Sequence, residues 1–225
     1  VVDGDGLDTR TADYTNILAR ATQINAGIWA QDLKVVSGAN NISASNAANP
    51  IATPGVGTGT GTAPAFALDV AALGGMYAQK ITLVGTESGL GVRNSGVIGA
   101  TAGDVTVNSQ GWLTNSGTVS AVGSTRIQTA GDITNTGEIV ATDTSRLDTA
   151  ATLRNQGLID SGNAAGTSQT QIQATTVENL GSARIYGDTV SLAATTLTKD
   201  IDATSSSTAA ATIASRQGLN IGVDT

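Results

Sequence analysis

Aliphatic residues recur at three fixed offsets through the second half of the chain. The three sets are Val92, Leu113, Ile133, Leu153 and Val177; Ile98, Val119, Ile139 and Ile159; and Val107, Ile127, Leu147 and Ile172. The intervals within the first set are 21, 20, 20 and 24 residues. A unit of this length cannot bury its apolar side chains alone, so a repeat near 20 residues is typical of a solenoid, in which each coil packs against its neighbours.

The segments around these positions have the composition of β-strands. They are rich in Val, Ile and Thr, and Gly, Asn or Ser interrupts them every few residues, which excludes helices and favours short strands. Three such segments per period predict three short strands per coil. Each strand then pairs with its equivalent about 4.8 Å away in the next coil. The pattern predicts an all-β fold, a parallel β-helix with about 20 residues per coil.

An asparagine followed two residues later by a glycine recurs in step with these positions. The five pairs are Asn94 and Gly96, Asn115 and Gly117, Asn135 and Gly137, Asn155 and Gly157, and Asn179 and Gly181. An amide can donate to one neighbour and accept from another, so stacked asparagines are predicted to form a ladder at one corner. The glycines are predicted to supply positive φ at that corner. A common turn pattern without a ladder is the alternative, and the regular spacing argues against it.

The sequence predicts three regions that differ in how regularly the repeat recurs. Residues 1–84 are expected to form less regular coils with a loop excursion at 44–65, which holds all three prolines and a glycine-rich run. Residues 85–200 are expected to form the regular coils, with an insertion at 161–166 that maps to a surface loop. Residues 201–225 are expected to form a loosened terminal coil.

Composition excludes several classes of function. With no His and no Cys, the chain lacks the usual zinc ligands and most nucleophile–base pairs, and we expect no metal and no cofactor. A net charge of −7 offers no basic stripe, so nucleic acid is not an expected partner. No apolar run is long enough to span a membrane.

Carboxylates are the remaining candidates for catalysis. Parallel β-helices include enzymes that cleave polysaccharides, which use paired acids. In the repeat frame, Asp132 aligns with Trp112 and Thr152, so no second acid stacks beside it. We therefore expect no catalytic residues and no enzyme, with a carbohydrate-active β-helix enzyme as the alternative. Trp112 is expected to point outward, either stacking along the coils or presenting its ring to a sugar.

The segment from Ala67 to Asn94 resembles a known family. It reads LGGMYA at 73–78, LVGTE at 83–87 and GLGVRN at 89–94, and it is similar to two-partner secretion exoproteins of Gram-negative bacteria. These are the filamentous haemagglutinins, haemolysins and contact-dependent inhibition proteins. Residues 19–30 and 33–40 resemble the closing coils of their secretion domain. The family's N-P-N-G-I and N-P-N-L motifs are absent, so the chain is expected to begin downstream of them. Within this segment, we expect Glu87 to pair with Arg93.

The resemblance implies a right-handed β-helix that is exported unfolded through an outer-membrane transporter and folds at the cell surface. The expected function is a shaft segment of a large secreted filament, spanning the end of the secretion domain and the first haemagglutinin repeats. It would act in adhesion and cell–cell contact through an unknown receptor or glycan. The alternative is the shaft of a contact-dependent inhibition protein that carries a carboxy-terminal toxin. Either function implies a secreted protein associated with the outer surface of a Gram-negative cell.

Overall fold

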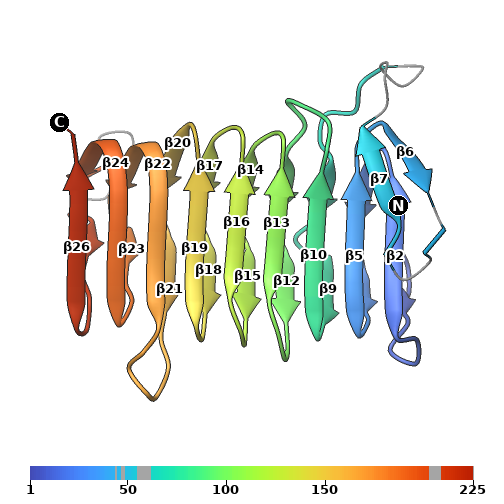
Figure 1. Cartoon of the computed structure of the whole chain (residues 1–225), viewed down its shortest axis with the longest axis horizontal. Helices are drawn as coiled ribbons and strands as arrows, with labels where there is room; N and C mark the ends of the chain where they lie inside the picture. The colour runs from blue at the N-terminus through green and yellow to red at the C-terminus, as the bar shows by residue number, and fades with distance from the viewer. Residues whose placement is uncertain (44, 47–48, 55–61, 203–208, 225) are drawn as a thin grey trace.

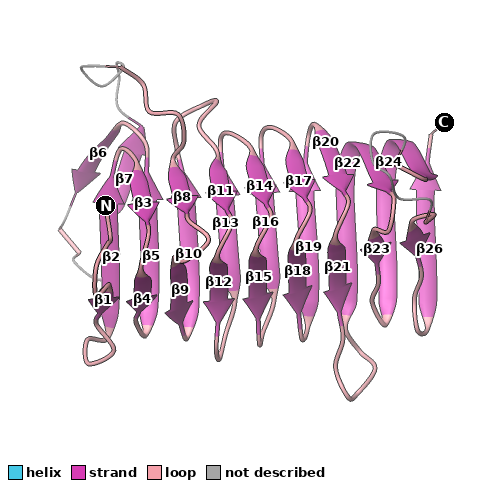
Figure 2. Ribbon diagram, turned by 180° about the vertical axis from the view of Figure 1, so that it is seen from behind, coloured by secondary structure: helices cyan, strands magenta, loops and turns pink. Residues whose placement is uncertain are grey.

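The fold consists of strands wound into successive parallel coils (Figures 1 and 2). The computed structural model describes residues 1–43, 45–46, 49–54, 62–202 and 209–224. Every strand among these residues belongs to one of two large parallel sheets or to one small antiparallel sheet. The predicted all-β solenoid is confirmed, and nine strands stack in one of its sheets.

Three columns of strands run along the solenoid. The first column holds β2 (Tyr14–Ala19), β5 (Asp32–Ser37), β10 (Lys80–Gly85), β13 (Val105–Ser109), β16 (Thr125–Thr129), β19 (Thr144–Thr149) and, at its end, β26 (Gly218–Val223). The second column holds β3 (Thr22–Ile24), β8 (Leu68–Val70), β11 (Val92–Asn94), β14 (Leu113–Asn115), β17 (Ile133–Asn135) and β20 (Thr152–Asn155). The third holds β1 (Leu7–Asp8), β4 (Gly27–Trp29), β9 (Gly75–Ala78), β12 (Val97–Ala100), β15 (Thr118–Ala121), β18 (Glu138–Ala141), β21 (Leu158–Ser161), β23 (Arg184–Ile185) and β25 (Thr212–Ile213).

Two late coils depart from the predicted three strands. β22 (Gln169–Leu180) and β24 (Thr189–Asp200) each run through the corner between the first and second columns and pair along their whole length. In earlier coils this corner contains Gly111 or Gly131, whereas Thr175 occupies it in β22. The coil just before β22 also turns here, at Ala150 and Ala151, without a glycine. Its corner is one residue longer, because Leu147 and Leu153 are six residues apart, whereas their partners Ile172 and Val177 are five apart. The shorter connection, which contains the β-favouring Thr175, stays extended.

The core is the stacked interior of these coils. The three aliphatic sets lie in register along the three columns, as their spacing predicts. Each of their members is at most 3% exposed. Each coil therefore buries its apolar side chains mainly against equivalent residues above and below it.

The loop excursion contains more structure than predicted. β6 (Asn40–Ser43) pairs antiparallel with β7 (Ile51–Pro54), so a strand lies inside the segment expected to be loop. The glycine-rich run at 55–61 lies outside the described residues.

The predicted pairing of Glu87 with Arg93 is wrong. Glu87 binds Arg20 with an Nη2–Oε1 distance of 2.8 Å, and its other oxygen accepts the backbone N–H of Ala39 at 3.0 Å. Arg93 pairs instead with Asp69, its direct neighbour across β11 and β8, at 2.7 Å. Glu87 thus fastens the start of the excursion to a corner of the solenoid.

Candidate functional site

The five predicted asparagines form one column at a buried corner. Each is 0% exposed. The Nδ2 of each donates to the Oδ1 of the next, at 2.7 Å from Asn94 to Asn115, 2.8 Å to Asn135, 2.9 Å to Asn155 and 2.8 Å to Asn179. We call this column the asparagine ladder.

The ladder also joins two columns of strands. Each of the five Nδ2 groups, including that of Asn179 at the end of the ladder, also donates to a backbone carbonyl of the third column in the following coil. These acceptors are Thr118, Glu138, Leu158, Arg184 and Thr212, at 3.0 to 3.3 Å. Buried carbonyl and amide groups without hydrogen bonds would destabilise the fold. The ladder therefore supplies hydrogen bonds to the polar groups at the corner where the chain leaves one sheet for another.

The corner glycines are required for a different reason from the one predicted. Gly181 alone has a positive φ, 65°, while Gly96, Gly117, Gly137 and Gly157 do not. A Cβ on any of these four would overlap the backbone carbonyl of the glycine one coil earlier. The four are therefore needed because successive backbones approach too closely for a side chain, not because of their dihedral angles.

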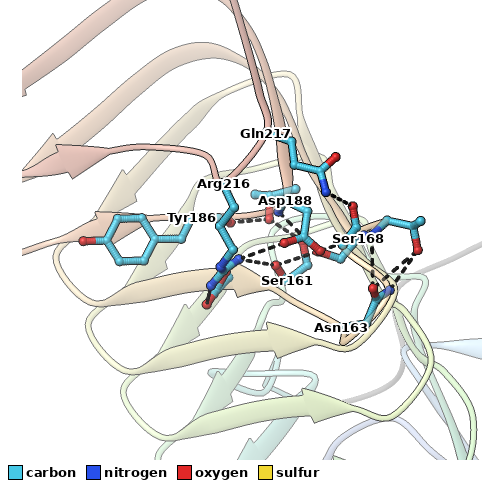
Figure 3. Close-up of polar contacts among 11 residues, drawn as sticks. Ser161, Asn163, Ser168, Tyr186, Asp188, Arg216 and Gln217 are labelled. Carbon is cyan, nitrogen blue, oxygen red and sulfur yellow. Dashed lines mark hydrogen bonds and ion pairs between the residues drawn. The ribbon is translucent and has the colours of Figure 1, made fainter.

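A second polar cluster lies beside the insertion at 161–166 (Figure 3). The N–H and Oγ of Ser168 both donate to Asp188 Oδ2, at 3.1 and 2.7 Å. Arg216 binds Asp160 at 3.0 Å and lies 3.7 Å from Asp188. Gln217 donates to the carbonyl of Gly166 at 2.6 Å. We call this the insertion cluster.

The insertion cluster binds three successive coils together. Ile159, Ile185 and Ile213 are aligned in three successive coils. Asp160 directly follows the first of them, whereas Asp188 and Arg216 come three residues after the second and the third. The hydrogen bonds from Ser168 hold the pKa of Asp188 below its usual value, and Asp160 raises the pKa of Arg216. The two carboxylates share one guanidinium, an arrangement suited to a structural clamp rather than to acid–base chemistry.

Sequence reasoning did not find the insertion cluster, although the repeat period carries a signal for it. Asp188 lies 20 residues after Ser168, one period along. The same offset joins Asp104 to the N–H of Ser124, and Asp132 to the N–H of Thr152. An aspartate one period from a corner residue therefore marks a carboxylate that caps a neighbouring coil's backbone.

Known proteins resemble this chain over about half its length. Residues 1–115 match the model of the TPS secretion domain. "Toxin CdiA" of Yersinia pestis is 47% identical over 122 residues, and "tRNA nuclease CdiA-2" of Burkholderia pseudomallei is 46% identical over 119 residues. "16S rRNA endonuclease CdiA" of Enterobacter cloacae is 41% identical over 124 residues. These matches cover 52–55% of the chain, and the chain spans about 4% of each relative.

No solved structure matches the chain at a significant level. The domain match extends past residue 84 into the regular coils, and the predicted boundary there stays a prediction. Among the described residues, no helix is long and apolar enough to cross a membrane. Since the family model covers more than half of the 225 residues, the chain belongs to the exported proteins that carry the TPS secretion domain, the two-partner secretion exoproteins.

Proposed function

We propose that this segment is a structural part of the shaft of a surface filament, which holds distal activities away from the producing cell. The observation that supports it is the unbroken parallel register from β2 to β26, reinforced at one corner by the asparagine ladder. A solenoid of this kind gains stability from each neighbouring interface, so it can be long without a globular core.

Membership of the family implies an outer-membrane transporter as the export partner. We propose that stacking contributes to export, because each folded coil offers a paired edge to the strand that follows it. Val119 and Ile139 are 0% exposed and stack directly on one another. A charge at either position would oppose the addition of coils.

Secretion of variants of the native exoprotein tests this mechanism. Val119→Asp and Ile139→Asp are expected to reduce the amount at the cell surface and to leave protein that proteases degrade. Ser120→Asp is the matched control, because Ser120 lies on the same strand and is partly exposed. Normal secretion of both core variants would rule out folding-assisted export.

A second candidate is delivery of a toxin in contact-dependent inhibition. It is favoured by the names of the three relatives given above, one of which is called a toxin and two of which are called nucleases. The native product distinguishes the candidates. A carboxy-terminal domain of different composition that inhibits growth inside neighbouring cells would make this a toxin-delivery shaft, whereas its absence would favour adhesion through a receptor or glycan.

We further propose that the segment is not itself an enzyme. Several of its acids are held in ion pairs: Asp69 with Arg93, Glu178 with Arg154, and Asp160 with Arg216. Incubation of the purified chain with uronate polymers is expected to give no cleavage. Cleavage that is lost on replacing one aspartate would support the carbohydrate-active enzyme instead.

A further inference from the structure

A hollow of about 500 Å³ opens on the outer surface at the corner between the first and second columns. The residues that line it include Gln110, Trp112, Thr114, Asp132 and Thr134. Its volume lies within the range of small-molecule sites. We call it the Trp112 hollow.

The hollow exists because two aligned side chains contact opposite neighbours. The indole of Trp112 lies over Gly91 in the preceding coil, where a Cβ would overlap the ring. Asp132 occupies the equivalent place one coil later, and its Oδ1 accepts the N–H of Thr152 in the following coil at 3.0 Å. One side chain is held toward each end of the solenoid, and space remains between them.

Ion pairs bound this stretch of the surface. In the outward row of the second column, Arg93 pairs with Asp69 at 2.7 Å on one side of the hollow. Arg154 pairs with Glu178 at 2.8 Å on the other side. The two positions between the arginines are Thr114 and Thr134, which stack on each other. The charged row is therefore interrupted by two small hydroxyl side chains beside an aromatic ring.

The lining offers unused hydrogen-bonding groups. Within the part of the chain that the structure describes, the Gln110 amide, the Thr114 and Thr134 hydroxyls and the Trp112 indole N–H make no hydrogen bond. Asp132 uses Oδ1, which leaves Oδ2 as an acceptor. An aromatic face beside several donors and acceptors suits a sugar, whose C–H face stacks on the ring while its hydroxyls hydrogen-bond to the rim.

We infer that the Trp112 hollow binds a neutral sugar residue of a glycan. Among the residues that the structure describes, Asp132 is the only charged one that lines the hollow, and the chain carries a net charge of −7. A uronate or a sialic acid would be repelled by this carboxylate, whereas neighbouring hydroxyls of a neutral sugar can donate to it. This inference adds a ligand to the proposed shaft but does not depend on the mechanism of export.

Fluorescence titration of the purified 225-residue chain tests the inference. The chain has two tryptophans, Trp29 and Trp112, so Trp29→Phe leaves Trp112 as the sole indole reporter. Phenylalanine keeps an aromatic ring beside Tyr77, on which Trp29 stacks with ring centroids 6.3 Å apart. Lactose, maltotriose and diacetylchitobiose serve as neutral probes, and sialyllactose and trigalacturonate serve as acidic ones. At least one neutral probe is expected to change the Trp112 emission in a saturable way, with weaker binding of every acidic probe.

Variants then locate the site. Trp112→Ala is expected to weaken the neutral probe by about tenfold, the value of one good aromatic contact, measured by calorimetry because the reporter is lost. Thr134→Val keeps the shape and removes only the hydroxyl, so it is expected to weaken binding without changing the circular dichroism spectrum. Trp29→Phe is the control and is expected to bind as the parent does.

Three results would overturn the inference: no binding of any neutral probe, equal or stronger binding of the acidic probes, or binding that both Trp112→Ala and Thr134→Val leave unchanged. Each of these outcomes leaves the secretion comparison of Val119→Asp with Ser120→Asp unaffected. Failure of the sugar site is therefore distinguishable from failure of the proposed shaft.

Discussion

Asn94 lies directly beside Val70 in the neighbouring strands β11 and β8, and its Oδ1 is buried without a hydrogen-bond partner among the described residues. Its Nδ2 donates to Asn115 at 2.7 Å. The asparagine ladder therefore has a direction, since every amide donates toward the carboxy-terminal coils. The first oxygen of the ladder, Asn94 Oδ1, therefore has no donor from a preceding asparagine.

This direction predicts unequal costs for the same substitution at two rungs. Asn94→Val moves the unpaired oxygen to Asn115 and leaves the count of unpaired oxygens unchanged. Asn115→Val keeps the one on Asn94 and creates another on Asn135, whose Oδ1 accepts from Asn115. We expect Asn115→Val to lower the free energy of unfolding by about 1–3 kcal/mol more than Asn94→Val. Denaturant titration measures the difference, and equal losses would contradict the ladder's direction.

The glycine stack makes a prediction about backbone spacing. A Cβ on Gly117 would overlap the carbonyl of Gly96, whereas a Cβ on Gly99 would meet only ordinary contacts, the nearest at 3.5 Å. Neither residue has a positive φ. We expect Gly117→Ala to destabilise the chain by about 1–3 kcal/mol, as overpacking does. Gly99→Ala is expected to be neutral or slightly stabilising. Similar changes in melting temperature for both variants would show that the distance between successive backbones does not exclude a Cβ at Gly117.

Asp188 is predicted to make stability depend on pH. The Ser168 hydrogen bonds lower its pKa below the ordinary 3.8, so the folded state binds this proton less readily than the unfolded state. The stabilisation is complete above 3.8 and is lost as pH falls through the lower, folded-state pKa. The melting-temperature difference between the parent and Asp188→Asn is expected to shrink over that acidic range. A difference that stays constant over that range would contradict this role of Asp188.

Glu87 is predicted to hold the excursion against the solenoid. Glu87→Gln removes the charge that binds Arg20 and weakens the acceptor for the Ala39 N–H. We expect a loss of about 1–2 kcal/mol, between the values for exposed and buried charged contacts. Hydrogen exchange at the Ala39 amide should accelerate. The exposed Glu138 gives the control, Glu138→Gln, and unchanged exchange in Glu87→Gln would contradict the anchoring role.

Periodicity predicted what repeats. The register of Leu113 with Ile133, and of Asn115 with Asn135, follows from a 20-residue offset because parallel strands place equivalent residues side by side. The inward direction of Asn115 follows from that of Leu113 two residues earlier, because side chains alternate between the two faces along a strand. The stacking of the regular coils and the positions that face the core could therefore be predicted from the sequence.

Contacts between residues that the repeat does not relate cannot be predicted from the period. Glu87 and Arg20 are 67 residues apart, and the excursion between them removes any periodic relation. The glycine spacing marks the corner, but a spacing cannot distinguish a requirement for positive φ, which only Gly181 of the five shows, from a close approach of two backbones. The Trp112 hollow arises where Trp112 and Asp132 differ at one repeated position, so its shape depends on contacts rather than on the pattern.

The matched register also bears on how such a gene can change. From Leu113 to Leu153, each coil presents the same asparagine, glycine and aliphatic positions to the next. An unequal crossover that duplicates or deletes 20 codons would therefore join one intact interface to another, with the ladder bonds and the glycine contacts restored across the seam. The length of the solenoid can thus change by whole coils while the fold stays the same.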